Sequence, residues 1–378
     1  MGEISRRILV TGANGFIGKN LTLRLRERDG NTVSTFLRGD DSDRLAALVA
    51  QADAVIHLAG ENRPADEDSF AEVNTGLTVA ICHAIKNEYK NSGRHIPLLL
   101  ASSIQADQNN PYGRSKLAAE EAVESLSLAT GNPCVVYRLP GVFGKWCKPN
   151  YNSVVATFCH NIARDLPIQI NNPETFLQLV YVDDVVSALL ASLEAPVPGL
   201  KKEKVEPEYS ISLDTLAEHI LGFKECRTTL MTDRVGQGLI RALYATYVSF
   251  LPNESFAYEV SRYVDPRGVF VEMLKTPDCG QFSYFTAHPG ITRGGHYHHT
   301  KSEKFLVIKG NALFRFRHLV TDELFELKTS GMEAQIVDTI PGWSHDITNI
   351  GTDELVVMLW ANENFDREKP DTVAHKVK

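Results

Sequence analysis

The chain of 378 residues lacks both a block of basic residues and an uninterrupted apolar segment. Lysines and arginines number 39 against 47 acidic residues and are spread along the chain, so nucleic acid and anionic membranes are not expected partners. The most apolar run, residues 179–193, is broken by Asp183 and Asp184. The first predicted strand is already under way at Ile8, which leaves no room before it for a secretion signal. We therefore expect a cytoplasmic protein without a membrane span.

Paired cysteines are also missing. The six cysteines are scattered without a Cys-x-x-Cys pair, and a chain of this length does not need disulfides to hold its core together. We expect reduced, mostly packed thiols at Cys82, Cys134, Cys147, Cys159, Cys226 and Cys279.

Two patterns of apolar residues divide the chain. Up to about residue 250, short apolar strands alternate with helical stretches, which predicts a doubly wound parallel sheet in which the segment 194–207 is an exposed loop. From residue 253 onward, short β-rich runs are punctuated by glycine and proline. We predict an α/β Rossmann-type domain over residues 1–252, followed by an all-β domain over residues 253–378.

A glycine-rich turn follows the first predicted strand. Gly12, Gly15 and Gly18 stand where the strand turns sharply into a helix, so backbone N–H groups and the positive helix end can approach a pyrophosphate. Glycine turns also close strands for purely conformational reasons, but the place after the first strand favours a dinucleotide site.

The end of the second strand bears on the choice of coenzyme. An acidic residue there holds the ribose hydroxyls of NAD, whereas an arginine accommodates the 2′-phosphate of NADP. This strand ends at Phe36-Leu37-Arg38, so we predict NADPH. The alternative is that Arg38 is a solvated charge at the end of a strand.

A tyrosine and a lysine begin a predicted helix four residues apart. This spacing places Tyr112 and Lys116 on one helix face, where a lysine ammonium is expected to lower the pKa of the phenol and make it a proton donor to an alkoxide. A nearby hydroxyl must orient the substrate carbonyl. We predict Ser103, at the end of strand 98–103, with Ser102 as the alternative.

The first domain resembles the extended short-chain dehydrogenase/reductase family through residues 11–18, 57–60, Asn74 and 112–116, and the resemblance spans roughly residues 6–250. It implies Ser103, Tyr112 and Lys116 as catalytic residues, Asn74 as a supporting polar residue, and nucleotide sugars as substrates. Ser103 and Tyr112 are closer in sequence than is usual in that family. The predicted cofactor-binding residues are Gly12, Asn14, Gly15, Phe16, Ile17, Gly18, Arg38, Leu58, Ala59, Tyr112 and Lys116.

A polar, aromatic loop over residues 145–152 follows a predicted strand end, where open α/β sheets bind ligands. Lys145 and Lys148 are therefore candidates to bind a diphosphate or uracil. An ordinary packed surface loop with two solvated lysines is the alternative.

Seven of the twelve histidines follow residue 280. His296 and His298 point the same way along a strand, whereas His299 points oppositely and is a poor ligand candidate. Glu303 arrives from the next strand and His345 from a later one, which gives three nitrogens and one oxygen around a cation.

The spacing Gly-x5-His-x-His-x4-Glu-x6-Gly over residues 290–310 and a second motif over residues 341–349 are similar to the two motifs of the cupin family, a small double-sheet β-barrel. The second motif lacks the residue that normally separates proline from glycine. The resemblance implies a metal centre at His296, His298, Glu303 and His345. We choose zinc because the reaction considered below needs a Lewis acid without redox change. A polar but empty barrel is the alternative.

A reductase fused to this barrel, with segments 149–154 and 360–366, resembles a family of bifunctional enzymes of capsular polysaccharide synthesis. That resemblance implies a UDP-linked 2-acetamido-2,6-dideoxy-4-hexulose as substrate, epimerised at C3 by the cupin domain and then reduced at C4 with NADPH, on a route to UDP-N-acetyl-L-fucosamine. Reduction first would remove the ketone that acidifies the C3 hydrogen.

Two other interpretations stay open. The second domain could be a non-catalytic module for dimerisation or sugar binding, because small β-barrels dimerise edge to edge, or an oxygen-using metal domain. We expect a homodimer. The base that removes the C3 proton is not identifiable, and Tyr284 and His288 are weak candidates.

Overall fold

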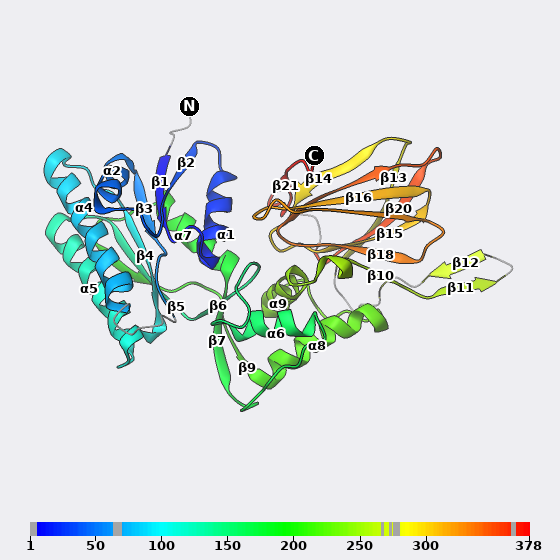
Figure 1. The fold of residues 1–378 in the computed structure, drawn as a ribbon, viewed down its shortest axis with the longest axis horizontal. Helices are drawn as coiled ribbons and strands as arrows, with labels where there is room; N and C mark the ends of the chain where they lie inside the picture. Colours follow the sequence, from blue (N-terminus) through cyan, green and yellow to red (C-terminus); the bar gives the residue numbers. More distant parts are fainter. Residues whose placement is uncertain (1–5, 63–69, 266–267, 272–273, 275–279, 364–367) are drawn as a thin grey trace. The chain divides into compact units, whose positions relative to one another are not determined.

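The computed structural model describes residues 6–62, 70–265, 268–271, 274, 280–363 and 368–378 (Figure 1). The chain forms two compact units, and each unit is built from two separate stretches of the sequence. The first contains Met1–Val142 and Leu177–Ser210, and the second contains Phe143–Phe176 and Ile211–Lys378.

The first unit is built on a six-stranded parallel sheet with the order β2-β1-β3-β4-β5-β8. The chain goes from β1 to β2 on one side and then to β3 on the other, which creates a switch point beside β1 of the kind at which open α/β sheets bind ligands. The strands are β1 (Arg6–Thr11), β2 (Asn31–Phe36), β3 (Ala54–His57), β4 (Leu98–Ser103), β5 (Cys134–Leu139) and β8 (Leu200–Glu203).

Helices cover both faces of this sheet because its strands carry apolar side chains on both sides. In β1, Ile8 and Val10 join the core beneath α1 and α7, whereas Leu9 joins the core beneath α2, α4 and α5. The helices are α1 (Phe16–Arg26), α2 (Ser42–Gln51), α4 (Leu77–Ser92), α5 (Pro111–Thr130) and α7 (Val182–Glu194), with a π-helix η1 (Ala71–Gly76) and a 3-10 turn η2 (Ile104–Asp107). The doubly wound sheet expected from the alternation of strands and helices is confirmed.

The sequence predicted that the segment 194–207 is an exposed loop, but the structure shows that part of it is a strand. It contains β8, which pairs in parallel with β5 as the sixth strand of the sheet. Lys201 and Lys202 of this edge strand are exposed, and such charged residues do not form the apolar pattern that predicts a strand. Backbone pairing to β5 supplies the hydrogen bonds that its side chains do not predict.

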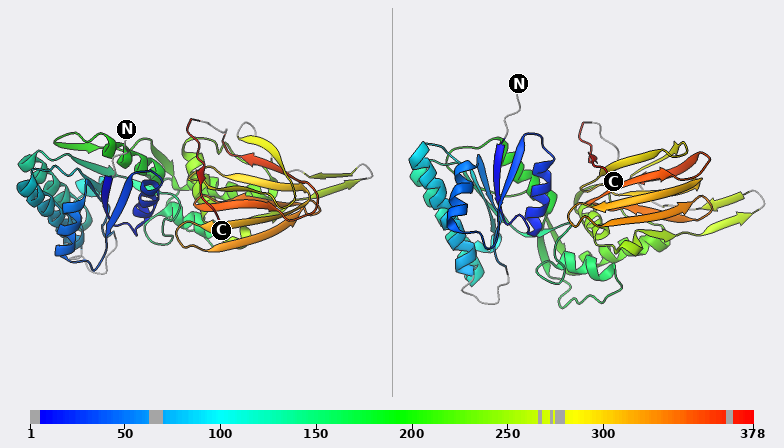
Figure 2. Two further views of the ribbon diagram at one scale, coloured as in Figure 1. Left: turned by 90° about the horizontal axis from the view of Figure 1, so that it is seen from above. Right: turned by 45° about the horizontal axis from the view of Figure 1, so that its top comes forward.

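The second unit contains two five-stranded antiparallel sheets (Figure 2). One has the order β10-β18-β15-β20-β13 and the other β17-β16-β19-β14-β21. Their strands are β10 (Ala257–Glu259), β13 (Gln281–Ala287), β14 (Thr292–Tyr297), β15 (Glu303–Lys309), β16 (Asn311–His318), β17 (Leu324–Ser330), β18 (Gln335–Thr339), β19 (Trp343–Asn349), β20 (Leu355–Ala361) and β21 (Val373–Ala374). The described part of the chain after residue 260 is thus a β domain.

Three helices belong to the same unit as these sheets: α6 (Val154–Ile162), α8 (Leu213–Thr229) and α9 (Gly238–Ser249). A 3-10 turn η3 (Asn253–Ser255) leads into β10, and β11 (Arg262–Asp265) pairs with β12 (Gly268–Val271) as a hairpin. A further sheet has the order β6 (Gly141–Phe143), β7 (Phe176–Tyr181) and β9 (Glu208–Ser212). The domain boundary predicted at residue 252 stays a prediction. Helices α6, α8 and α9 precede residue 252 in the sequence but belong to the same compact unit as the β-sheets.

A buried ion network joins α8 to the β-sheets of its unit. Asp338 of β18 accepts hydrogen bonds from Arg227 of α8 at 2.6 Å and from Lys304 of β15 at 2.8 Å. The Lys304 ammonium also donates to the Tyr258 hydroxyl at 3.0 Å. All three charged side chains are mostly or fully buried, so each depends on the others for compensation.

Five cysteines are free and buried, as expected, whereas Cys279 lies outside the described residues. Part of the segment 360–366 also lies outside them. Among the helices that the structure describes, none combines the length and apolarity needed to cross a bilayer.

Candidate active site and candidate metal centre

The glycine loop between β1 and α1 leaves no space for side chains at two positions. Gly12 has φ +69°, and a Cβ atom there would lie 2.6 Å from the backbone nitrogen of Ala59. A Cβ atom at Gly18 would lie 2.1 Å from the carbonyl oxygen of Gly12. Gly15 is the N-cap of α1 and supplies no side-chain cap, so the first N–H groups of this helix suit an anion.

A buried hydrogen-bond chain holds the end of β3 beside this loop. The Thr11 hydroxyl accepts from the N–H of Ala59 at 3.2 Å and lies 2.6 Å from Nδ1 of His57, whose Nε2 lies 2.8 Å from the Thr78 hydroxyl. Thr78 itself donates to the carbonyl of Asn74, so His57 donates from Nε2 and accepts at Nδ1. Burial, with the charge of Lys116 adding to it, lowers the pKa of His57 to about 3. The predictions missed Thr11 and Thr78.

Arg38 follows β2, as predicted, and its side chain is 85% exposed. Its guanidinium pairs with the Glu61 carboxylate at 2.8 Å. The sequence reasoning did not consider Glu61, which lies 23 residues away. The basic end of β2 is therefore accompanied by an acidic group that competes with a phosphate for Arg38.

The two candidate serines at the end of β4 have different partners. Ser102 donates to the buried carboxylate of Glu120 at 2.5 Å. Ser103 caps η2 by accepting from the N–H of Gln105 at 3.2 Å and hydrogen-bonds to Tyr112. The structure therefore places Ser103, and not Ser102, beside the tyrosine.

Tyr112 and Lys116 lie one turn apart in α5, with the ammonium 5.8 Å from the centre of the phenol ring. Lys116 is buried and donates to the carbonyl of Ala101 at 3.3 Å. Burial lowers its pKa to about 8, although the charge of Glu120 acts in the opposite direction. The expected low pKa of Tyr112 is not found, because burial raises it and the hydrogen bond with Ser103 only partly offsets this.

Asn74 is buried in η1 and connects neighbouring segments. Its carboxamide accepts from the N–H of Glu61 at 2.8 Å, donates to the Glu61 carbonyl at 3.1 Å and donates to the Ser115 hydroxyl at 3.0 Å. Ser115 in turn donates to the carbonyl of Tyr112 at 2.7 Å. Asn74 thus orients the helix turn that carries Tyr112.

The loop 145–152 packs against the β-sheets of its own unit. Trp146 donates from Nε1 to His318 at 3.1 Å, and a Cβ atom at Gly342 would lie 2.8 Å from the indole ring. Lys145 is buried, and the Lys148 ammonium lies 4.9 Å from the centre of the Tyr151 ring. Trp146 is packed, but the buried Lys145 does not fit the alternative of two solvated lysines, and a role of this loop in binding a diphosphate or uracil stays a prediction.

The four predicted metal ligands come together in the second unit. Ligand atoms of His296, His298, Glu303 and His345 all lie within 4.8 Å of one another. Nε2 of His298 lies 3.1 Å from Oε2 of Glu303, and Nε2 of His345 lies 3.5 Å from the same oxygen. Three imidazoles and one carboxylate form a set that binds divalent first-row metals.

A β-bulge in β14 brings His296 opposite His345. The pairing with β19 runs from Gly294 with Asp346 to His296 with His345, and Gly294 and Gly295 both have positive φ. His298 follows the end of β14, and Glu303 begins β15. His299 is absent from the cluster, as predicted, but strand alternation is not the reason, because His298 and His299 both lie beyond the end of β14.

The protonation of these groups suits a cation. Burial, together with the neighbouring histidines, lowers the pKa of His296 to about 3, and burial also lowers the pKa of His345. For Glu303, burial acts to raise the pKa, but the close approach of the His298 and His345 rings outweighs it and holds the pKa well below its usual range. Both ring nitrogens of His345 are buried without a hydrogen-bond partner in the described structure, so the residues fit a metal.

A cavity of about 210 Å³ between the two sheets adjoins this cluster. It is lined by Phe285, Arg293, Gly294, His296, Glu303, Phe305, Phe314, His345, Asp346, Ile347 and Leu359. Asp346 pairs with Arg315 at 2.7 Å, so it does not form a dyad with His345. The weak base candidates Tyr284 and His288 are exposed and outside this lining.

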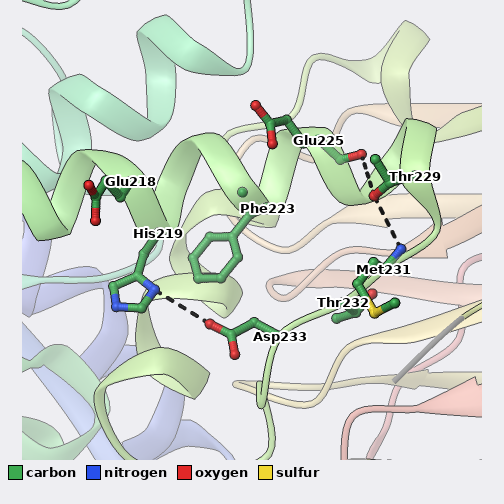
Figure 3. Close-up of a pocket in the computed structure, with 9 residues that line it drawn as sticks. Glu218, His219, Phe223, Glu225, Thr229, Met231, Thr232 and Asp233 are labelled. Atoms are coloured by element: carbon green, nitrogen blue, oxygen red, sulfur yellow. Dashed lines mark hydrogen bonds and ion pairs between the residues drawn. The ribbon is translucent and has the colours of Figure 1, made fainter. Parts of the chain in front are cut away.

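A second cavity, of about 400 Å³, lies beside α8 (Figure 3). His219 and Asp233 face each other across it at 3.5 Å, next to the ring of Phe223. None of the predicted site residues lines it.

A Rossmann sheet with a glycine loop at a helix N-terminus and a Tyr-x-x-x-Lys helix defines a nicotinamide-dependent class of enzymes. The sequence model of the NAD dependent epimerase/dehydratase family matches residues 8–206, and the chain belongs to this family. Residues 263–373 match the polysaccharide biosynthesis C-terminal domain.

The similarity to particular proteins extends over the whole chain. The chain is 55% identical over 371 residues to a UDP-2-acetamido-2,6-beta-L-arabino-hexul-4-ose reductase of Pseudomonas aeruginosa, covering 98% of this chain and 99% of that protein. The crystal structure of the capsular polysaccharide assembling protein CapF from Staphylococcus aureus matches with 38% identity and a TM-score of 0.63, covering 98% and 100%. The Bordetella bronchiseptica enzyme WbmF in complex with NAD+ shares the fold, with 21% identity and a TM-score of 0.52 over 58% of this chain and 79% of WbmF.

Proposed function

We propose that the chain acts on a UDP-linked 2-acetamido-2,6-dideoxy-4-hexulose, inverting C3 in its β domain and then reducing the C4 ketone with NADPH. The observation that carries this proposal is the 55% identity, along nearly the full length of both chains, to a reductase named for such a 4-keto sugar. The match to CapF over 98% of the chain supports a role in capsular polysaccharide precursor synthesis.

For the reduction, the proposed catalytic residues are Ser103, Tyr112, Lys116 and Asn74. NADPH, when bound, supplies the hydride for C4. The Ser103 hydroxyl donates to the C4 carbonyl oxygen and orients it, and Tyr112 donates its phenolic proton to that oxygen as negative charge develops. Lys116 supplies a positive charge one helix turn away, and Asn74 keeps that turn in place.

The coenzyme is proposed to lie over the glycine loop and the end of β3. Gly12 and Gly18 allow the close approach of backbone that a pyrophosphate needs, and Arg38 accompanies the 2′-phosphate of NADPH. The other residues proposed to contact it are Asn14, Gly15, Phe16, Ile17, Leu58, Ala59, Tyr112 and Lys116.

For the epimerisation, we propose that the β domain is a cupin barrel whose His296, His298, Glu303 and His345 hold one zinc ion. The cation, when bound, supplies a positive charge that stabilises negative charge on a carbonyl oxygen. The adjoining cavity of about 210 Å³ combines the metal-ligand side with apolar walls formed by Phe285, Phe305 and Phe314, which suit the body of a sugar ring. Epimerisation comes first because the C4 ketone acidifies the C3 hydrogen.

The order of the two steps gives the test. The protein, incubated with the UDP-4-keto sugar in deuterium oxide without NADPH, is expected to exchange the C3 proton, as followed by NMR. Addition of NADPH is then expected to give a product reduced at C4. Absence of C3 exchange by the intact protein contradicts the epimerase half and leaves the reductase half standing.

A second candidate follows from the name of the Pseudomonas relative, which mentions only reduction. In that case the chain is a C4 reductase, and the β domain serves dimerisation or sugar binding. Replacement of His296 and His298 by alanine separates the two candidates. Loss of C3 exchange with retained C4 reduction in this variant supports the bifunctional enzyme. C4 reduction without any C3 exchange by the wild-type chain supports the alternative, and so does a variant that changes only the oligomeric state.

A further inference from the structure

The C-terminal segment 371–378 lies against the strands that carry the proposed metal ligands. β21 pairs with β14 so that Ala374 is opposite His296. The backbone N–H of His375 donates to the carbonyl of Gly295 at 2.8 Å, and its carbonyl accepts from the hydroxyl of Ser344 at 2.7 Å. One short segment therefore contacts both β14 and β19.

The side chain of Asp371 organises the loop between His298 and Glu303. Its carboxylate accepts from the consecutive backbone N–H groups of His299, Thr300 and Lys301 at 2.9, 2.7 and 2.8 Å, and from the Thr300 hydroxyl at 2.9 Å. These three residues are buried and belong to no strand. Without Asp371, these N–H groups would be left buried without an acceptor, which is unfavourable.

The main chain of the same residue orients a ligand. Nδ1 of His298 hydrogen-bonds to the carbonyl oxygen of Asp371. A carbonyl only accepts, so Nδ1 carries the proton of this bond and Nε2 is the ring nitrogen that faces the other ligands. That Nε2 is the atom 3.1 Å from the Glu303 carboxylate. Asp371 thus bears on both the loop and the tautomer of one ligand.

A second set of bonds holds the other end of the loop. The N–H of Ser302 donates to the side chain of Asn362 at 2.9 Å, and the N–H of Glu303 donates to the Thr339 hydroxyl at 3.0 Å. These bonds come from the sheet itself and do not involve the C-terminal segment. Loss of Asp371 is therefore expected to release the His298 end of the loop while the Glu303 end stays in place.

We propose that Asp371 is a positioning residue of the candidate metal centre, through which the C-terminal segment sets the geometry of the His298–Glu303 loop. The inference rests on the metal site proposed above. It assigns a role to a residue that lies 68 positions after Glu303 in the sequence. Partners that orient metal-ligating histidines change metal affinity by ~10–100-fold when they are lost.

The test measures metal binding and geometry in the full chain. Wild type, D371N and the matched control D353N, which changes an exposed turn aspartate, are titrated with Co²⁺ against a chelator, and the visible spectrum of bound Co²⁺ is recorded. D371N is expected to bind Co²⁺ ~10–100-fold more weakly, with a changed spectrum and faster amide exchange at residues 299–301. D353N is expected to match wild type. Circular dichroism and urea unfolding of the full chain show that each variant is folded.

The outcomes are distinct. Unchanged affinity and an unchanged Co²⁺ spectrum in D371N overturn the positioning role and leave the metal site intact. A wild-type chain that binds no Co²⁺ overturns the proposed metal centre and this inference with it. If D371N does not fold, T300V removes the Thr300 hydroxyl, which donates to Asp371 and also accepts from Arg241. R241K is then the control for the Arg241 contact, and wild-type affinity and spectrum in folded T300V overturn the inference.

Discussion

Ser102 donates its hydroxyl proton to the buried carboxylate of Glu120 at 2.5 Å, whereas its neighbour Ser103 hydrogen-bonds to Tyr112. Successive residues of β4 point to opposite faces, so only one of the two serines can reach the tyrosine. Arg138 also binds Glu120, at 2.7 Å, which commits Ser102 to a structural ion network.

Replacement of either serine by alanine therefore has separate consequences. S103A is expected to lower kcat for reduction of the 4-keto sugar by ~10²-fold or more, because the carbonyl loses its orienting donor. S102A is expected to leave kcat near wild type and to lower the free energy of unfolding by ~1–3 kcal/mol, because Glu120 loses a buried donor. Steady-state kinetics and urea unfolding measure the two effects. Equal losses of kcat would falsify the assignment of Ser103.

We predict that coenzyme preference depends on Arg38 and its partner Glu61. R38A is expected to weaken NADPH binding by ~10–100-fold while leaving NADH unchanged, because a charge-assisted bond to the 2′-phosphate contributes ~1.5–3 kcal/mol. E61Q removes the carboxylate that pairs with Arg38 and is expected to tighten NADPH binding. Fluorescence titration with both coenzymes provides the measurement. Tighter binding of NADH than of NADPH by wild type contradicts the prediction.

The buried His57 makes stability depend on pH. Its pKa falls from 6.5 to about 3 on folding, mainly through burial, so below pH 6.5 the unfolded chain takes up a proton that the folded chain refuses. The free energy of unfolding is therefore expected to fall between pH 6.5 and 3, by on the order of 4 kcal/mol from this group.

The variant H57Q keeps a neutral polar side chain and is expected to lose that part of the pH dependence. H83Q, at an exposed position of α4, is the control and is expected to follow wild type. The urea midpoint of each variant, measured between pH 7 and 4 in steps of about one pH unit, tests this expectation. The same slope in H57Q and wild type argues against a neutral His57.

Asp338 compensates two buried cations, Arg227 and Lys304. D338N leaves both without a counter-charge and is expected to lower the free energy of unfolding by ~3–5 kcal/mol. D322N changes a side chain that is 72% exposed and is expected to leave the free energy of unfolding close to that of wild type, although Asp322 also pairs with an arginine. Chemical unfolding compares the two variants, and similar small losses contradict the assigned role of Asp338.

Local patterns predicted much of the candidate sites. The glycine loop, the Tyr112–Lys116 spacing and the His296–His298 pair depend on the geometry of a single turn, helix or strand, so short stretches of sequence suffice to indicate them. The alternation of strands and helices in the same way predicted the doubly wound sheet. Strand β8 was not predicted because it is held by backbone hydrogen bonds to β5, which do not require any particular side chains.

The order of the residues is enough to tell which chemical groups the chain carries and which of them share a helix, strand or turn. Partners that lie far apart in the chain depend on the fold: Glu120 for Ser102, Glu61 for Arg38, His318 for Trp146 and Asp371 for the loop after His298. Those partners depend on how separate strands and helices pack, and packing also sets the burial that raised the pKa of Tyr112 where the sequence predicted a fall.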